Sequence, residues 1–489
     1  MTDSTQGLPA HAAQVRTALD SIGGFPPDWV PPQEGSDTDV VIIGAGQAGL
    51  SIAFGLKRAG ISRIRLLDAA PENAQGVWHT RAYMPNLRTP LINPGPELGV
   101  PELSLASWYR ARHGEAAFSA LEKCPTADWA AYLDWFRDTL ELPVTYQTRL
   151  TAVRPAGSLL VLTLATASGA RTLTTRRLIL ATGLAGSGQP RIPELIRQAL
   201  PKDRYHHSLE HIDTRQLQGR HIGVIGSSTS AFDMAALALE AGARQVDMLS
   251  RRPEIVTIAK FAAAAYPGAK YAHLLPDAVL WQISTHYLDQ GSPPPVQSVG
   301  RATRHENFRL HLNAPLASVH SESGRIAIRA GATTHEFDHL LCGTGFDTDL
   351  ALRPELQPWI TQAATWSDRV PEARHSGNPL ARFPYLSPGF ALQERTPGTA
   401  PWLEKIHIFN YAAHIGVARS VGDISSLSKL VPRLVDAIGA SLFLEDREAQ
   451  LARLTGIPQM SETLSREHYA HRLAPPAALH ASPHEDAAA

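Results

Sequence analysis

Cysteine is scarce in this chain of 489 residues, which contains only Cys124 and Cys342. The two lie far apart in the sequence and form no Cys-x-x-Cys pair, so we expect neither a disulfide framework nor a redox-active dithiol. The 21 histidines are scattered, and we find no set of His and Cys residues at the spacing of a zinc site. We therefore expect no bound metal and no chemistry based on a thiol pair.

An excess of charge of one sign is also absent, because 45 Lys and Arg residues face 46 Asp and Glu residues and the net charge is −1. We therefore expect no nucleic-acid partner and no membrane partner. No segment approaches the roughly 18 apolar residues that span a bilayer, and the N-terminus lacks the apolar core of a signal peptide. We expect a cytoplasmic protein that binds small molecules, and the oligomeric state stays open.

A strand, a glycine-rich turn, a helix and a second strand follow one another twice in the chain. The first copy begins with "DVVIIGAGQAGLSIAFGLKRAG" at residues 39–60, and the second is "HIGVIGSSTSAFDMAALALEAGARQVDMLSRR" at residues 221–252. After each copy, short alternating runs with turn signals end in an apolar strand and a Thr-Gly pair. The sequence therefore predicts an α/β protein with two Rossmann-like dinucleotide-binding domains, each with an antiparallel β-meander crossover.

The first turn, "GAGQAG", has the full glycine pattern of a dinucleotide site. Gly44 permits the tight bend, Gly46 lets the main chain approach a pyrophosphate, and Gly49 allows the helix to pack closely on the strand. The N-terminus of the following helix presents free N–H groups to the phosphates. Asp68 ends the next strand, where a carboxylate can bind a ribose diol.

The second turn, "GSSTSA", is a weaker version of the same pattern. Gly226 is retained, and Ser228 stands where the second glycine is usual. The hydroxyl of Ser228 could donate a hydrogen bond to a phosphate, and we include Thr229 and Ser230 as cofactor-binding candidates at the start of the helix.

Arg251 and Arg252 follow the strand that ends the second copy, at the position where an NAD-specific site carries an acid. Two guanidinium groups there suit the 2′-phosphate of NADPH. The alternative is that both are solvated arginines of a surface loop.

Together these motifs resemble the class B flavin monooxygenases, which include flavin-containing monooxygenases, Baeyer–Villiger enzymes and lysine or ornithine N-hydroxylases. The resemblance covers about residues 36–435. It includes "GAGQAG", a "GVW" loop that ends at Trp78, "LILATG" with Gly183, the second turn, and "LLCGTGFDTDL" with Gly345 and Phe346. It implies FAD in the first domain, NADPH in the second, and a C4a-hydroperoxyflavin that delivers one oxygen atom to a substrate.

On this basis the chain divides into five segments. They are an N-terminal extension 1–35, a first part of the FAD-binding domain 36–218, an NADPH-binding domain 219–345 with an insertion at 253–313, a second part of the FAD-binding domain 346–440, and a C-terminal extension 441–489 whose end we expect to be disordered.

The sequence also departs from the family pattern. The FxGxxxHxxx fingerprint of two subclasses does not precede the second turn, and Pro90 stands where flavin-containing monooxygenases have an Asn. The subclass therefore stays open. Near the flavin we select Asn410 and Arg88 as catalytic candidates, and we favour Asn410 over Asp423 of the Gly-Asp pair for the contact with the flavin ribityl chain.

We therefore expect an FAD- and NADPH-dependent monooxygenase that acts with O₂ on a small organic substrate by N-hydroxylation, S-oxidation or a Baeyer–Villiger reaction. The cofactor carries the difficult chemistry, so no catalytic triad is required. Two alternatives remain: an NADPH oxidoreductase or oxidase without oxygen transfer, and a flavin- or NADPH-binding sensor without turnover.

Overall fold

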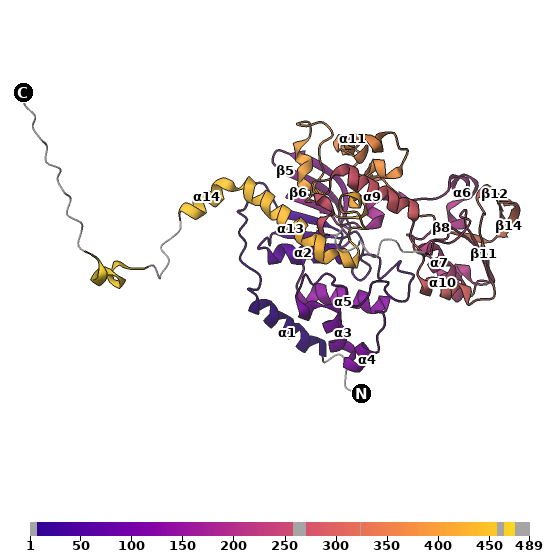
Figure 1. Cartoon of the computed structure of the whole chain (residues 1–489), viewed down its shortest axis with the longest axis horizontal. Coiled ribbons are helices and arrows are strands. Elements are labelled where there is room, and N and C mark those ends of the chain that lie inside the picture. The colour runs from indigo at the N-terminus through magenta and orange to yellow at the C-terminus, as the bar shows by residue number, and fades with distance from the viewer. Residues whose placement is uncertain (1–6, 258–269, 323, 457–463, 475–489) are drawn as a thin grey trace, which may run out of the picture. The chain divides into compact units, whose positions relative to one another are not determined.

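The computed structural model describes residues 7–257, 270–322, 324–456 and 464–474 (Figure 1). Contacts divide the chain into two units, Met1–Leu442 and Phe443–Ala489. The first unit contains both glycine-rich turns. The second unit contains the end of one long helix and the short helix α14 Arg447–Thr455, and nearly all of the tail that we expected to be disordered lies outside the described residues.

The first sheet has seven strands. They are β1 Thr38–Ile43, β2 Ile64–Leu67, β3 Val144–Thr145, β4 Arg149–Ala156, β5 Leu159–Thr166, β6 Gly169–Leu180 and β17 Ile406–Ile408. Their order is β3-β2-β1-β6-β5-β4, with β17 parallel to β6. Strands β4, β5 and β6 form the expected antiparallel meander, and β6 returns parallel to β1.

The second sheet repeats this plan with five parallel strands. They are β8 Tyr205–His207, β9 His221–Ile225, β10 Gln245–Leu249, β11 Phe308–His311 and β15 His339–Cys342, in the order β11-β10-β9-β15-β8. A separate three-stranded antiparallel sheet forms its meander: β12 Leu316–Glu322, β13 Arg325–Ala330 and β14 Thr333–Phe337. The fold class predicted from the sequence is therefore confirmed.

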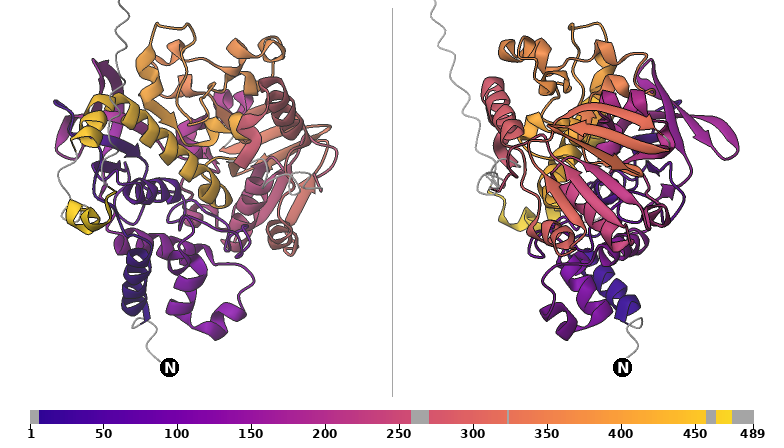
Figure 2. Two further views of the ribbon diagram at one scale, coloured as in Figure 1. Left: turned by 60° about the vertical axis from the view of Figure 1, so that its left-hand side comes forward. Right: turned by 90° about the vertical axis from the view of Figure 1, so that its right-hand side faces the viewer.

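Helices cover the sheets and the connections between them. In the first unit they are α1 Gly7–Ser21, α2 Gln47–Arg58, α3 Leu105–His113, α4 Glu115–Ser119, α5 Thr126–Thr139, α6 Glu194–Ala199, α7 Thr229–Glu240, α9 Asp277–Gln290, α10 Val296–Thr303, α11 Trp366–Arg369, α12 Pro371–Arg374 and most of α13 Ile424–Glu445. Helix α13 packs on α2, where a Cβ on Gly55 would lie 3.0 Å from Val435. Figure 2 shows α1, α3 and α4, in indigo and purple, grouped at one end of this unit.

Parallel strands such as β1 and β10 are buried on both faces of their sheets. Successive side chains of a strand point to opposite faces, so they pack in two different cores. In β1, Val40 and Ile42 pack in the core that includes α2 and α13, and Val41 packs in the core on the meander side. In β10, Val246 and Met248 pack in the core that includes α7. The side chain between them, that of Asp247, therefore faces the second meander.

The chain passes between the two domains twice, and the two connecting segments form a short antiparallel pair of strands. Its strands are β7 Gly188–Pro190 and β16 Phe346–Thr348. The first follows the meander of the first sheet and the second follows β15. The two dinucleotide domains are thus connected by two neighbouring extended segments.

Three elements differ from the expectations. Residues 7–21 of the expected extension form the helix α1, which buries His11, Val15 and Leu19 at intervals of four. Strand β11 lies inside the range 253–313 that we expected to be an insertion, because an alternating run of only four residues is too short to stand out in the sequence. Strand β8 joins the second sheet although it precedes residue 219.

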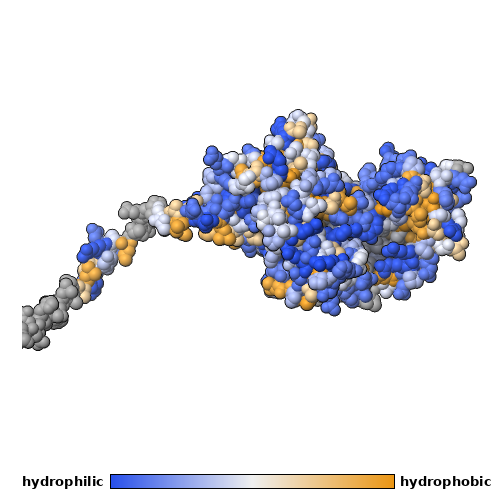
Figure 3. All heavy atoms as spheres, turned by 90° about the horizontal axis from the view of Figure 1, so that it is seen from above, coloured by the Kyte–Doolittle hydropathy of each residue, from blue (hydrophilic) through white to orange (hydrophobic). Residues whose placement is uncertain are grey.

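No helix within the described ranges is both long and apolar enough to cross a membrane. Hydrophilic residues prevail on the face in Figure 3, and its hydrophobic areas are small and separate.

Candidate active site

The first turn fixes its own shape through two glycines. Gly44 has a φ of +105°, and a Cβ there would lie 2.5 Å from the carbonyl oxygen of Ala181. A Cβ on Gly49 would lie 1.8 Å from the carbonyl oxygen of Gly44. A side chain at either position would therefore collide with backbone, so the fold itself requires both glycines.

Gly46 differs from these two. It is the N-cap of α2 in an extended conformation, and a Cβ there would meet only Gly76 Cα, at an ordinary 3.7 Å. No side chain caps the helix at this residue. The first N–H groups of α2, which lack partners within a helix, are thus donors for an anion such as the FAD pyrophosphate, and the absent side chain leaves room for it.

Asp68 lies beside this turn, directly after β2. Its carboxylate accepts hydrogen bonds from the backbone N–H of Ala45 at 2.7 Å and of Ala70 at 2.8 Å. The residue is buried. The carboxylate therefore holds the turn in place at the edge where a ribose was expected, and its oxygens retain lone pairs for further donors.

Gln47 links the turn to three other segments, a role that sequence reasoning missed. Its Oε1 accepts hydrogen bonds from Trp78 Nε1 at 3.0 Å and from Trp129 Nε1 at 3.2 Å. Its Nε2 donates to the Gly422 carbonyl oxygen at 2.7 Å. The structure thus brings the "GVW" loop to the turn, as the resemblance implies. Trp129 gave no signal because a buried Trp in an amphipathic helix is typical of a core residue.

Asn410 is fully buried directly after Phe409, at the end of β17. Its Nδ2 donates to Thr182 Oγ1 at 3.1 Å, and its Oδ1 accepts from the Ala412 N–H at 2.9 Å. Thr182 belongs to the "LILATG" segment and precedes Gly183, which has a φ of +60°. Asn410 is therefore held against the end of β6.

The competing Gly-Asp pair stands at the start of α13. Asp423 accepts from the Ser426 N–H at 2.8 Å and pairs with Arg419 at 3.3 Å, while Gly422 contacts Gln47 as described. Both candidate segments therefore reach the first domain: Asn410 at the "LILATG" segment and Gly422 at the turn.

Arg88 lies elsewhere, in an ion pair with Asp233 of α7. Asp233 also accepts a hydrogen bond from Ser298 Oγ at 2.6 Å and lies 3.7 Å from Arg301. Burial lowers the pKa of Arg88, and the charge of Asp233 opposes this shift. Arg88 thus connects the segment after the "GVW" loop to the helix of the second turn, and none of its contacts within the described ranges reaches Asn410.

The second turn repeats the geometry of the first. Gly226 has a φ of +116°, and a Cβ there would lie 2.5 Å from the Gly343 carbonyl oxygen. Ser228 is the exposed N-cap of α7, and its side chain caps none of the helix N–H groups. Thr229 and Ser230 begin the helix. The N-terminus of α7 is therefore a second set of donors for a phosphate.

Arg251 and Arg252 are exposed immediately after Ser250, at the end of β10. Ser250 Oγ lies 2.7 Å from Ser227 Oγ, so the segment with the arginines is tied directly to the turn. Their guanidinium groups are accessible where a 2′-phosphate was expected.

The late "GTG" segment follows β15. The Gly345 carbonyl oxygen accepts a hydrogen bond from His207 Nε2 at 2.8 Å, and Phe346 begins β16. These residues lie where the second connection between the domains begins.

A cavity of about 270 Å³ lies beside the first turn. Trp129 lines it and at the same time donates to Gln47. Glu97 lies in its wall with both oxygens accepting from the Gly95 N–H, and burial raises its pKa. Ile424, the first residue of α13, closes another side. The cavity is thus formed between the segment after the "GVW" loop, α5 and α13.

Burial shifts the pKa values of both cysteine thiols and of the His414 imidazole. Burial raises the pKa of both Cys124 and Cys342 to about 12, so neither is a thiolate at neutral pH. His414, four residues after Asn410, is half-buried, and burial lowers its pKa to about 4. It is therefore a neutral imidazole at physiological pH.

Comparison with known proteins identifies the family of the chain. Residues 38–270 match the family model of pyridine nucleotide-disulphide oxidoreductases. The chain is 38% identical over 455 residues to the FAD-dependent urate hydroxylase of Xanthomonas campestris pv. campestris. The alignment covers 92% of this chain and 95% of that protein.

Solved structures share the fold at lower identity. The ornithine N-hydroxylase of Kutzneria sp. 744 aligns with a TM-score of 0.64 at 16% identity, over 83% of this chain and 99% of the other. The L-lysine 6-monooxygenase of Pseudomonas syringae gives a TM-score of 0.62 at 17% identity over the same shares. The chain therefore belongs to the family of the Xanthomonas FAD-dependent urate hydroxylase, and it shares its fold with these two N-hydroxylating enzymes.

Proposed function

We propose that the chain is an FAD-dependent monooxygenase that uses NADPH and O₂ to hydroxylate urate or a closely related oxidised purine. The observation that carries this proposal is the 38% identity to a urate hydroxylase, which extends through both turns and over nearly all of both chains. Carbon hydroxylation is not among the three reactions that we expected from the sequence, because no motif in the chain selects a substrate.

The residues of the two turns supply the binding groups. The N–H groups of α2 would hold the FAD pyrophosphate, and Asp68 would hold the ribose. The N-terminus of α7 would hold the NADPH phosphates, with Arg251 and Arg252 on the 2′-phosphate. When bound, the flavin carries two electrons from NADPH to O₂. One oxygen atom enters the purine, the other leaves as water, and the purine itself undergoes no net loss of atoms.

The cavity beside the first turn is the proposed substrate site. Trp129 lines the cavity, and a flat purine that pairs with its indole ring would gain about 0.5–1.5 kcal/mol beyond area burial. The side chains of Thr89, Asn93 and Ser104 in its lining provide hydrogen-bonding groups for purine carbonyl and N–H groups. Pro90 and Leu91 among its apolar walls reduce the access of water, which protects an oxygen-transfer reaction.

Disulfide reduction, which the name of the matching family model suggests, has no support at the two cysteines. Both are buried, and both have raised pKa values. A reductase of that kind needs an accessible thiolate.

The proposal is tested by NADPH oxidation in air. We expect urate to accelerate NADPH consumption and to disappear in proportion, as followed by chromatography. Adenine, which lacks the carbonyl groups of urate, is the matched purine control and should not accelerate it. The proposal fails if urate leaves the rate unchanged and is recovered intact while the electrons of NADPH appear as hydrogen peroxide.

Asn410→Ala is expected to raise the release of hydrogen peroxide relative to product while leaving flavin reduction by NADPH nearly unchanged. The substitution removes the hydrogen bond to Thr182 and the cap of the 3-10 helix Tyr411–Ala413. Asn410 positions Thr182 and this 3-10 helix beside the proposed flavin site, and we expect their displacement to affect oxygen transfer more than hydride transfer.

The control for Asn410 is Asn378→Ala. Asn378 caps the 3-10 helix Pro379–Arg382 in the same way, through a hydrogen bond of 2.9 Å from the Leu380 N–H, and is remote in sequence from the turn segments. It should leave the ratio of peroxide to product unchanged. If both variants shift the ratio equally, the effect is a general loss of stability and Asn410 has no special role.

A further inference from the structure

A group of histidines surrounds a buried carboxylate on the second sheet, away from the turn. Asp247 lies in the middle of β10, and its neighbours Val246 and Met248 pack on the α7 side. Its own side chain therefore faces the meander. The residue is only 4% exposed. A carboxylate at such a place is costly unless it is paired, so its partners are informative.

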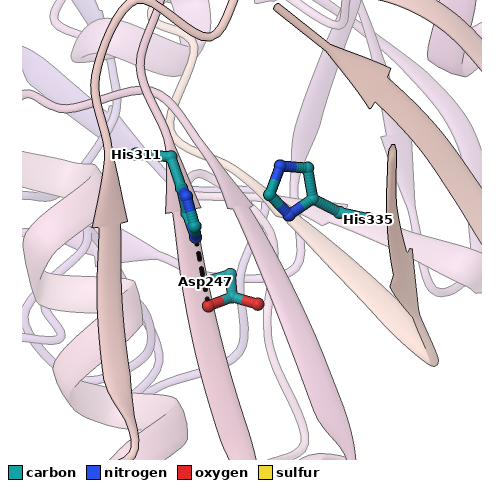
Figure 4. Close-up of side chains that lie close together, drawn as sticks. All are labelled: Asp247, His311 and His335. Atoms are coloured by element: carbon teal, nitrogen blue, oxygen red, sulfur yellow. Dashed lines mark hydrogen bonds and ion pairs between the residues drawn. The ribbon is translucent and has the colours of Figure 1, made fainter. Parts of the chain in front are cut away.

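Three imidazoles approach this carboxylate from three different strands. His221 Nε2 of β9 lies 2.7 Å from Asp247 Oδ2, and His311 Nε2 of β11 lies 3.3 Å from Oδ1. His335 comes from β14 of the meander, and the ligand atoms of Asp247, His311 and His335 all lie within 4.8 Å of one another. Figure 4 shows the His311 and His335 rings beside the carboxylate.

His335 is the member whose position hydrogen bonding does not explain. Its ring lies 4.6 Å from that of His311, centroid to centroid, and stacks on Phe337 at 6.1 Å. Among the described residues we find no hydrogen-bond partner for either of its nitrogens. A neutral imidazole at this position has one ring nitrogen with a free lone pair, which is the ligand atom that a metal ion needs.

We propose that Asp247, His311 and His335 form a binding site for a divalent transition metal, with zinc as the preferred ion, that clamps the meander onto the second sheet. Imidazole and carboxylate ligands suit zinc and its neighbours, whereas magnesium and calcium prefer oxygen ligands alone. Two His and one Asp supply three ligands of a tetrahedral site, and a water molecule can complete it, while His221 holds the other oxygen of Asp247.

The distances fit such an ion. Zinc–ligand bonds of about 2.0–2.1 Å place neighbouring ligand atoms of a tetrahedron about 3.3 Å apart. The separation between His311 Nε2 and Asp247 Oδ1 already has this value. The ligand nitrogen of His335 lies within 4.8 Å of the other two ligand atoms, so a small rotation of its ring would bring it to the same separation. Gln245 Nε2 donates to both oxygens of Asp247, at 3.2 and 3.0 Å, which orients the carboxylate as an outer partner of the ligands.

The place of the site indicates a structural role. His221 is the first residue of β9, and the second turn follows the last residue of that strand, about 13 Å further along. The metal would join β10 and β11 of the parallel sheet to β14 of the meander. It requires no change in the proposed reaction. Spacings of 64 and 24 residues between the three ligands conceal the set from a search by sequence motif.

The test uses the full chain loaded with FAD and carrying no histidine tag. The protein is stripped with EDTA, incubated with zinc chloride and desalted, and its metal content is measured by mass spectrometry. We expect about one zinc per chain and a higher melting temperature for the zinc form than for the stripped form. His335→Ala should abolish both effects with little change in the stripped protein, because His335 forms no hydrogen bond there.

His320→Ala is the control, since His320 is exposed on β12 of the same meander. It should retain the zinc and the rise in melting temperature. If the parent holds no more zinc than His335→Ala, or if zinc leaves the melting temperature of the parent unchanged, these residues do not form a metal site and the proposal is wrong.

Discussion

Gly46→Val is expected to yield a folded protein without flavin. Gly46 has φ −73° and ψ −176°, an extended conformation that valine adopts readily, and a Cβ there meets no protein atom closer than 3.7 Å. The new side chain therefore enters only the space proposed for the pyrophosphate. We expect the flavin content per chain to fall by about tenfold or more, which corresponds to at least about 1.4 kcal/mol of binding free energy. Flavin absorbance after desalting measures it.

The matched control is Gly300→Val, because Gly300 is exposed in α10 with no atom within 4 Å of an added Cβ. This variant should keep the flavin content of the parent. Gly49 would be a poor choice, since its Cβ would lie 1.8 Å from the Gly44 carbonyl oxygen and would disturb the fold. An unchanged flavin content in Gly46→Val, at an unchanged melting temperature, would contradict the placement of FAD at this turn.

Replacing both Arg251 and Arg252 with alanine is expected to weaken NADPH binding by roughly 10 to 150-fold, because charge-assisted hydrogen bonds to a phosphate contribute about 1.5–3 kcal/mol. NADH lacks the 2′-phosphate, so its KM should stay near that of the parent. Both arginines are exposed, and little stability should be lost. Steady-state kinetics with each cofactor gives the two KM values.

The control is the double variant Arg220→Ala and Arg329→Ala, which removes two exposed positive charges from the same domain. Arg220 precedes β9, at the end remote from the turn, and Arg329 lies on β13. If the two double variants discriminate between NADPH and NADH as the parent does, Arg251 and Arg252 are solvated arginines and the assignment fails.

The double Rossmann plan could be predicted from the sequence because its main signals are local. Parallel strands such as β1 and β9 are buried apolar runs, and each is followed by a turn whose first glycine has a positive φ. The meanders were visible for the same reason, as alternating runs between turn residues. Strand β11 and helix α1 were missed, because their place depends on neighbours that are distant in the sequence.

The sequence could not distinguish glycines that the fold needs from glycines that a ligand needs. All three glycines of the first turn match the same pattern. The contacts separate them: a Cβ on Gly44 or Gly49 would collide with backbone atoms, and a Cβ on Gly46 would make only an ordinary contact of 3.7 Å with Gly76 Cα. This difference makes Gly46 the informative position for a test of binding.

Long-range partners of the site could not be predicted either. Gln47 joins Trp78, Trp129 and Gly422, which are separated from it by 31, 82 and 375 residues. The pairing of Arg88 with Asp233 spans 145 residues and joins two domains. A single sequence gives no signal for such contacts, so Arg88 entered the candidate site for its charge alone.

The central claim, that the chain transfers oxygen to a purine, is tested most directly with isotopically labelled O₂. The FAD-loaded enzyme is supplied with NADPH, urate and ¹⁸O₂, and the purine product is analysed by mass spectrometry while NADPH is counted. We predict one ¹⁸O atom in each hydroxylated product and one NADPH consumed for each product formed. Consumption of NADPH with no ¹⁸O in any purine, and with all its electrons recovered as hydrogen peroxide, would contradict the account.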